Sequence, residues 1–349
     1  MAETTLTIGN ELLSTTMHIL MKEWRDNVHE SVAFLDASER VHGAGKPVQS
    51  GGTRIVIPLG FGEHSTTTRL QTGFERINLS VSDVFTPAQY DWGHVVRPVA
   101  ISSEEEMTNQ GDAAILSILE SRTKMTANAL KREFVKQMVQ GSVTGWDDWG
   151  TLNGVDVTGT SGGFLEQDAV GSQGNTVGGV NKGSFTTKTG WQNQIFDGAG
   201  SFNANGLAGL YDLKVEIASV SPSGDPNVIL ASRAGFKNLK RALQAHERYV
   251  DQSQIDGGRL VEMWDGVQIN VERNMPTTGT NTTADPISFY MLNLDDIHVL
   301  WDPQGYFDLG DFETVSGEYD VRSAKLRCRG QLIAKHLGSS GIAFDLETF

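Results

Sequence analysis

The chain has 349 residues, which corresponds to about two domains, and 38% of these residues are hydrophobic. This apolar fraction excludes disorder of the whole chain, while no apolar run reaches the roughly eighteen residues that a membrane-spanning helix needs. Asp and Glu outnumber Lys and Arg by 43 to 28, and the resulting net charge of −15 disfavours tight binding to nucleic acid, which requires a basic surface.

The first part of the chain predicts a helix followed by a long β-hairpin. Apolar residues in helical spacing predict a helix over residues 6–35, and a glycine-containing loop is expected at 41–47. Residues 54–59 and 77–82 alternate with a period of two, and the polar segment 60–73 between them is expected to form the hairpin tip. Such a hairpin has too few apolar residues to form a core alone, so we expect it to lie against another surface.

A long helix gives the strongest local pattern. Hydroxyl and carboxylate side chains at 102–106 are typical of a helix start, and apolar spacing then continues from residue 112 to about Gln140. About thirty residues at 1.5 Å each would give a helix of roughly 45 Å. The segment 141–206 is rich in Gly, Ser, Thr and Asn, and a structureless loop of that length is unusual, so we expect short strands within it.

The second half predicts alternating helices and strands. Helices are expected at 207–220 and 233–248. Strands are expected at 227–231, 260–261, 267–271, 287–292, 297–301, 323–328 and 332–335. Cys328 has small or apolar neighbours on its face of a strand, which predicts a buried thiol. A lone cysteine cannot form an intrachain disulfide, and no secretory signal is evident, so we expect a cytosolic protein.

Segments that resemble catalytic motifs lack the context that those motifs need. The segment 43–47 resembles the end of a phosphate loop, but Pro47 replaces the required Ser or Thr. The segment 159–163 fits the nucleophile-elbow pattern without a helix directly after it. Eight scattered histidines and one cysteine argue against a zinc site. We therefore expect no catalytic, cofactor-binding or metal site.

Two acidic segments have a functional and a structural interpretation. Asp147 and Asp148 lie between two tryptophans and suggest a carbohydrate cleft, but adjacent carboxylates point to opposite sides of an extended chain, so a turn is favoured. The three glutamates at 104–106 are interpreted as a charged helix start rather than as a metal cluster.

The order of the segments resembles that of tailed-phage major capsid proteins of the HK97-fold class. The stretches that carry the resemblance are Gly51-Gly52, 85–92, 104–115 and 176–181, the last followed by Trp191. Their collinearity from about residue 1 to 345 implies an α+β, HK97-like capsid fold.

The resemblance also implies a domain map. Its parts are an N-terminal arm (1–48), an extended E-loop (49–99), a peripheral domain with a long spine helix (100–205), an α/β axial domain (206–293) and a return through the peripheral domain (294–349). In this family the axial domain meets its copies at five- and six-fold axes, and the E-loop lies across a neighbouring subunit. The residues expected at the inter-subunit contact of the E-loop tip are Phe61, Glu63, Thr66, Arg69 and Gln71.

The implied function is that of a major capsid protein, which self-assembles through hexamers and pentamers into an icosahedral shell around phage double-stranded DNA. The implied partners are other copies of the chain, a separate scaffolding protein, a portal and a decoration protein, with weak non-specific contact to packaged DNA and no membrane. The hairpin begins near residue 51, so we expect no fused scaffolding domain before it. The implied location is the virion, assembled in the host cytoplasm.

In some relatives, a lysine of the E-loop forms a covalent bond to a neighbouring subunit. Residues 47–123 of this chain contain no lysine, so we expect the subunits of the shell to be held together without covalent bonds.

Two alternatives to the capsid function remain open. One is an encapsulin-like cellular nanocompartment, which shares the fold. The other is a glycan-active or other enzyme built around residues 142–205.

Overall fold

The computed structural model divides the chain into two compact units. The smaller unit contains residues 1–29, 97–129 and 309–326, and the larger contains the remainder. The structure describes residues 33–41, 48–61, 69, 71, 73, 76, 84–108, 118–141, 143–146, 148–153, 163–184, 190–244, 255–256, 259–260, 262–276, 286–314 and 320–349. Within these ranges, no helix has both the length and the apolarity needed to cross a membrane.

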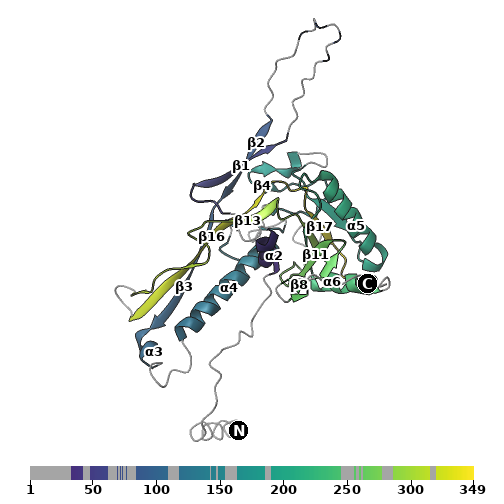
Figure 1. The fold of residues 1–349 in the computed structure, drawn as a ribbon. Helices are drawn as coiled ribbons and strands as arrows, with labels where there is room; N and C mark the ends of the chain where they lie inside the picture. Colours follow the sequence, from purple (N-terminus) through teal and green to yellow (C-terminus); the bar gives the residue numbers. More distant parts are fainter. Residues whose placement is uncertain are drawn as a thin grey trace. The chain divides into compact units, whose positions relative to one another are not determined.

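The larger unit contains a six-stranded sheet, which lies beside α5 and α6 in Figure 1. Its strands, in spatial order, are β10 (Glu262–Trp264), β11 (Val267–Val271), β7 (Val228–Ala231), β12 (Ile287–Leu292), β17 (Gly341–Phe344) and β6 (Gln194–Asp197). The β11–β7 and β17–β6 pairs are parallel, whereas the other neighbours are antiparallel. Every residue of β7, β12 and β17 is buried, as expected for central strands that are covered on both faces.

Two helices, α5 (Phe202–Val220) and α6 (Arg233–Gln244), pack against each other and against this sheet. Leu213 of α5 and Leu239 of α6 share one hydrophobic core with Phe289 of β12. The strands at 227–231, 267–271 and 287–292 and the helix at 233–248 are confirmed in type, although α6 is described only to Gln244.

Helix α5 begins five residues before the predicted start at 207. Ser201 caps it, because its hydroxyl accepts a hydrogen bond from the Ala204 amide at 3.4 Å. The prediction had assigned residues 202–206 to the glycine-rich segment that precedes the helix. Within α5, glycine allows close packing, because a Cβ at Gly209 would overlap the ring of Phe196 on β6.

A second sheet is built around β16 (Val321–Ala334), which pairs with β13 (Ile297–Trp301). The prediction of two strands at 323–328 and 332–335 is wrong, because Gly330 continues the ladder opposite Trp301. A Cβ at Gly330 would lie 2.8 Å from the Leu300 carbonyl oxygen, so this glycine permits a close approach rather than a turn. Cys328 is fully buried, as predicted.

The remaining elements complete the described part of the chain. They are α2 (Ala33–Val41), β1 (Arg54–Gly60), β2 (Phe85–Asp91), β3 (Gly93–Ser102), α3 (Ser103–Thr108), α4 (Ile118–Gln140), β4 (Thr176–Val177), β5 (Val180–Asn181), a 3₁₀ turn (Lys182–Ser184), β8 (Ile255–Asp256), β9 (Arg259–Leu260), β14 (Asp308–Leu309) and β15 (Glu313–Thr314). The strands β4, β5 and β6 confirm that the glycine-rich segment contains short strands.

Two predictions about the first half need correction, and a third is confirmed where the structure describes it. The first helix was expected over residues 6–35, of which 6–32 lie outside the described residues, and α2 continues past residue 35 to Val41. The return strand at 77–82 lies outside the described part, and β1 pairs instead with β2, from Arg54↔Asp91 to Gly60↔Phe85. The long helix ends at Gln140 as predicted, and its 23 described residues span about 34 Å.

The smaller unit confirms that the acidic segment is a helix start. The Glu105 amide donates to the Ser102 hydroxyl at 3.2 Å, and the Ser102 amide donates to the Glu105 carboxylate at 3.2 Å, which is a reciprocal capping box. Nη1 and Nη2 of Arg122 on α4 also donate to this carboxylate, at 2.8 and 2.7 Å. The hydrogen bonds from Arg122 are the main reason why the pKa of Glu105 falls to about 2.

Candidate functional site

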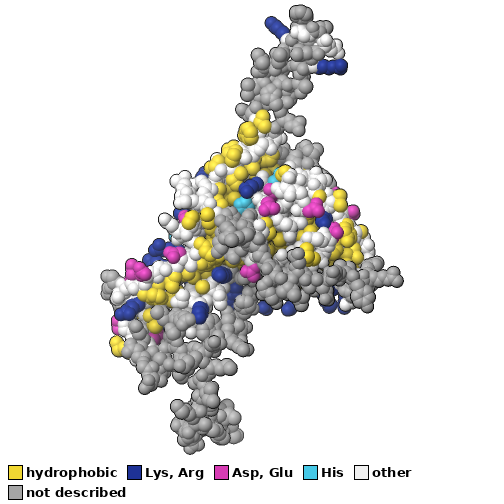
Figure 2. Space-filling view, viewed as in Figure 1, with side chains coloured by type: hydrophobic (Ala, Val, Ile, Leu, Met, Phe, Trp, Pro, Cys, Tyr) yellow, Lys and Arg dark blue, Asp and Glu magenta, His cyan; other side chains and the backbone are white. Residues whose placement is uncertain are grey.

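The paired strands β1 and β2, here called the ribbon, have one covered and one open face. Ile55 and Tyr90 lie opposite each other and are buried. On the other side, Val56 is 53% exposed and Phe85 is 74% exposed. Figure 2 shows hydrophobic side chains on the surface along this part of the molecule. The ribbon therefore presents apolar surface that its own subunit leaves uncovered.

The covered face is anchored through Tyr90 and the β4–β5 hairpin. The Tyr90 hydroxyl donates to the Ala334 carbonyl at 3.0 Å, and the Gln89 amide of β2 donates to the Gly178 carbonyl at 2.8 Å. Gly178 has a φ of +58°, and a Cβ there would lie 2.9 Å from the Tyr90 ring. Only glycine fits this position without strain, so the hairpin can approach the ribbon closely.

The predicted tip residues fall into two groups. Phe61 lies at the base of the ribbon, where its amide donates to the Val84 carbonyl at 3.2 Å and its ring meets Trp191 edge-on at 5.6 Å. Leu59, Gly60, Phe61, Gly190, Trp191, Lys335 and His336 line a cavity of about 300 Å³ here. Arg69 and Gln71 are exposed single positions, and Glu63 and Thr66 lie outside the described residues.

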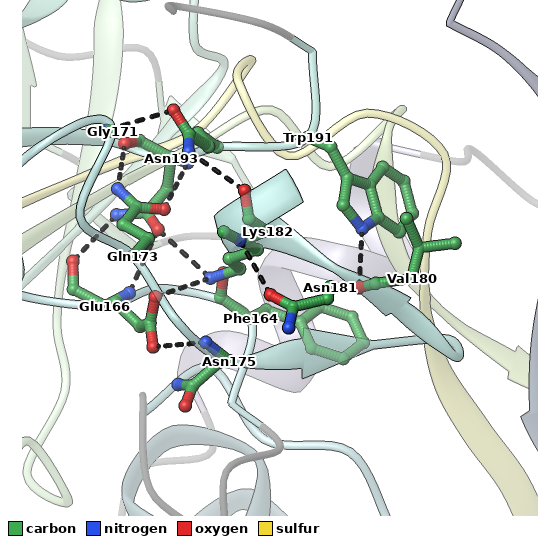
Figure 3. A network of polar contacts seen from close by, with 12 residues as sticks. Phe164, Glu166, Gly171, Gln173, Asn175, Val180, Asn181, Lys182, Trp191 and Asn193 are labelled. Carbon is green, nitrogen blue, oxygen red and sulfur yellow. Dashed lines mark hydrogen bonds and ion pairs between the residues drawn. The ribbon is translucent and has the colours of Figure 1, made fainter. Parts of the chain in front are cut away.

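Beneath the hairpin lies a buried polar network that the sequence did not predict (Figure 3). Its centre is Lys182, whose side chain is fully buried. The Nζ of Lys182 donates to the Phe164 carbonyl at 2.6 Å and to Asn193 Oδ1 at 3.2 Å, and it lies 3.9 Å from Glu166 Oε2. Glu166 is only 2% exposed, so both charged groups are removed from water.

Side-chain amides fill the rest of this network. Gln173 and the Asn193 backbone exchange two hydrogen bonds, of 2.8 and 3.3 Å. Asn193 Nδ2 donates to the Glu166 carbonyl at 2.9 Å, and the Asn175 amide donates to Glu166 Oε1 at 2.9 Å. These bonds replace those to water and hold the glycine-rich segment in one conformation, which supports the hairpin above it.

Burial changes the protonation of the central pair. Desolvation lowers the pKa of Lys182 to about 8 and raises the pKa of Glu166, while the charge of each partner acts in the opposite direction and only partly compensates. The neutral amine and the neutral acid are therefore far more accessible here than on a protein surface.

The alternative functional segments gain no geometric support. Trp146 and Trp149 are 4% and 3% exposed and pack around Phe134, so they do not offer an open surface on which a sugar could stack. Asp147, the phosphate-loop-like residues 43–47 and residues 159–162 of the elbow-like segment lie outside the described residues. In the ranges that the structure covers, no three His, Cys, Asp or Glu side chains are grouped so that they could hold a metal ion.

At the sequence level, no protein-family profile and no curated protein matches the chain. At the structural level, it is similar to a chain of the cyanophage A-1(L) capsid asymmetric unit, with 16% identity, a TM-score of 0.62 and coverage of 97% of this chain and 99% of the other. The capsid of an empty GTA particle gives 13% identity, a TM-score of 0.58 and coverage of 99% and 97%.

The SrpI encapsulin of Synechococcus elongatus is also similar, with 10% identity, a TM-score of 0.58 and coverage of 97% of this chain and 95% of the other. Each of these similarities extends over almost the whole of both chains. The mixed α+β fold of the protein is therefore that of capsid and encapsulin shell subunits, as the segment order had implied.

Proposed function

We propose that the protein is a major capsid protein that assembles through hexamers and pentamers into an icosahedral shell around phage double-stranded DNA. The observation that carries this proposal is the two-way coverage, which is at least 95% for capsid and encapsulin chains alike. A domain inserted into an unrelated enzyme would match only part of such chains. The chain would act as a structural component of the virion, assembled in the host cytoplasm, and not as an enzyme.

The domain map gives each region a role in this assembly. Residues 49–99 would be the E-loop, and α4 would be the spine helix of a peripheral domain over 100–205. Residues 206–293 would form the axial domain around the symmetry axes, with 1–48 as the N-terminal arm. The segment 294–349 would return through the peripheral domain.

The ribbon supports the E-loop assignment on physical grounds. Phe85 and Val56 keep more than half of their surface exposed in the subunit, and covering such side chains stabilises a contact by roughly 25 cal/mol per Å² of apolar area. A neighbouring copy of the chain would cover them, together with the tip residues Arg69 and Gln71 and with Glu63 and Thr66. Repeated contacts of this head-to-tail kind close into rings.

Other partners follow from the same proposal. A separate scaffolding protein and a portal would take part in assembly, and a decoration protein could bind the outside of the shell. The net charge of −15 favours weak contact with packaged DNA, because an acidic subunit releases few counterions from phosphate.

Electron micrographs of the purified protein test the proposal, because a shell protein should form closed particles or capsomers and an enzyme a small oligomer. Deleting residues 61–71 should leave a folded subunit that assembles poorly, with far-UV circular dichroism as the control for folding. Normal shells from this deletion would contradict the E-loop assignment.

An encapsulin-like nanocompartment is the second candidate, and the similarity to the SrpI encapsulin favours it. The two candidates differ in what their particles contain. Particles from the native source should hold nuclease-protected DNA if the protein is a phage capsid. Co-purification of one enzyme in place of DNA would support the nanocompartment.

A further inference from the structure

Lys182, Asn193 and Glu166 bring an amine, an amide and a carboxyl group together in the interior, and the proposed function assigns them no role. Their exposed fractions are 0%, 0% and 2%. The Lys182 amine already contacts the side-chain amide of Asn193, with Nζ 3.2 Å from Oδ1, and the carboxylate of Glu166 lies 3.9 Å from the same nitrogen. Figure 3 shows the three side chains gathered in one network.

We propose that Lys182 and Asn193 of the same chain become joined by an amide bond between Nζ of Lys182 and Cγ of Asn193, with release of ammonia. The bond would connect the 3₁₀ turn at Lys182–Ser184 to the segment that leads into β6. The bond lies within one subunit and so differs from a covalent cross-link between neighbouring subunits. The proposal does not depend on the assembly of a shell.

The geometry places the nucleophile next to its target. The carbon Cγ is one carbonyl bond, about 1.23 Å, from the oxygen that Nζ contacts, so a small side-chain rotation brings nitrogen and carbon to the separation of about 3–3.5 Å at which attack begins. The Phe164 carbonyl accepts another N–H of the amine at 2.6 Å and limits its rotation. The hydrogen bond from Asn193 Nδ2 to the Glu166 carbonyl keeps the amide beside the amine and leaves the small rotation of the lysine side chain to close the distance.

The surroundings also favour the reactive protonation states. Only a neutral amine can attack, and burial favours the neutral forms of both Lys182 and Glu166. Glu166 Oε2 is buried and accepts no hydrogen bond from the described residues, so it can receive the proton of the amine. The Glu166 amide donates to Asn193 Oδ1 at 3.0 Å, which would stabilise the negative charge that forms on this oxygen.

The steps balance in atoms and electrons. A proton first moves from Nζ to Glu166, and the nitrogen lone pair then forms a bond to Cγ while the carbonyl electrons move to Oδ1. Glu166 gives its proton to Nδ2 and takes one from Nζ, the Cγ–Nδ2 bond breaks, and ammonia leaves. The product keeps one hydrogen on Nζ, and no oxidant or other reactant is consumed.

The intact mass of the purified, folded protein tests the proposal directly. We expect a mass lower than the sequence mass by one ammonia molecule, and a branched tryptic peptide in which Lys182 is uncleaved and linked to Asn193. Cyclisation of Asn193 onto its own backbone would lose the same mass without joining two peptides, so the peptide assignment decides. The full sequence mass, or a deficit without the branched peptide, would overturn the proposal.

Three variants sharpen the test. Lys182→Arg keeps the cation but removes the nucleophile, since a guanidinium stays protonated, and Glu166→Gln removes the proton acceptor. Both should show the full mass of their own sequences. Lys240→Arg, at an exposed lysine of α6, is the matched control and should keep the deficit. A deficit that persists in Lys182→Arg would contradict the proposed bond even if the other variant fails to fold.

Discussion

The six-stranded sheet and the ribbon differ in how much of their apolar surface the subunit itself covers. Every residue of β12 is buried, between α5 and α6 on one face and the rest of the larger unit on the other. The ribbon buries Ile55 and Tyr90 but leaves Phe85 and Val56 open. The sheet is therefore complete within one chain, whereas the ribbon has an apolar face that a second chain can cover.

The largest expected effect comes from emptying the core of the sheet. Phe289 is fully buried and lies against Phe202 with a centroid separation of 6.2 Å. We expect Phe289→Ala to lower the free energy of unfolding by about 3–5 kcal/mol, because it removes apolar contacts and leaves a cavity. Urea denaturation of the unassembled subunit measures this loss, and a change below about 1 kcal/mol would show that the sheet is not the core.

A smaller effect is expected where the hairpin meets the ribbon. Gly178→Ala adds a Cβ 2.9 Å from the Tyr90 ring at a positive φ, whereas Gly179→Ala meets no atom within 4 Å at a φ of +78°. The first change should cost about 1–3 kcal/mol from overpacking in addition to the backbone strain that both changes share. Equal urea midpoints for the two variants would show that the hairpin does not brace the ribbon.

Substitution on the open face of the ribbon should separate assembly from folding. We expect Phe85→Ser to change the free energy of unfolding of the free subunit by no more than about 0.5 kcal/mol, because its side chain is largely exposed. The yield of shells should nevertheless fall, measured by size-exclusion chromatography. Val215→Ser on α5, which is 66% exposed, is the control outside the ribbon. If Phe85→Ser assembles as well as the wild type, the open face of the ribbon does not take part in the contact between subunits.

The interior around β16 should remain inaccessible to solvent even in the unassembled subunit, in which no neighbour covers the ribbon. Burial raises the pKa of the Cys328 thiol to about 12, so little thiolate exists at pH 8 and the sulfur has no access to solvent. Iodoacetamide should leave the native protein unmodified and should alkylate it after denaturation. Rapid alkylation of the folded subunit would show that β16 opens and exposes Cys328 to solvent.

Covalent links between subunits are not expected, because residues 47–123 contain no lysine. Boiling assembled particles in SDS should release a single band near 37.9 kDa, and a bond between Lys182 and Asn193 of one chain would leave that band single. A ladder of higher species that resists reductant would reveal another cross-linking site.

The sequence predicted best where apolar residues form continuous runs or recur at helical spacing. The strands β7 and β12 and the helix α6 were predicted because their patterns need no distant partner. The prediction missed β17, whose residues include a glycine and an alanine, and β3, which contains Pro98 and follows the ribbon without a clear break. The start of α5 was missed because residues 202–206 were assigned to the glycine-rich segment that precedes it.

The buried network could not be predicted for a different reason. Lys182 follows a glycine-rich stretch that is typical of a surface loop, and its partners Glu166 and Asn193 come from either side of it along the chain. A polar side chain is buried at low cost only when hydrogen-bond partners surround it in the fold. The local sequence pattern does not show which distant residues will be those partners. The exposure of Phe85 on the open face of the ribbon was not predicted either, because it depends on which face of the paired strands the rest of the subunit covers.

Hydrogen exchange of the backbone amides, compared between free subunits and assembled shells, tests most directly whether the ribbon is completed by a neighbour. Amides of β7 and β12 should exchange slowly in both states, because the subunit alone protects them. Amides of β1 and β2 should exchange faster in the free subunit and become protected on assembly. Equal protection of the ribbon in both states would contradict the account.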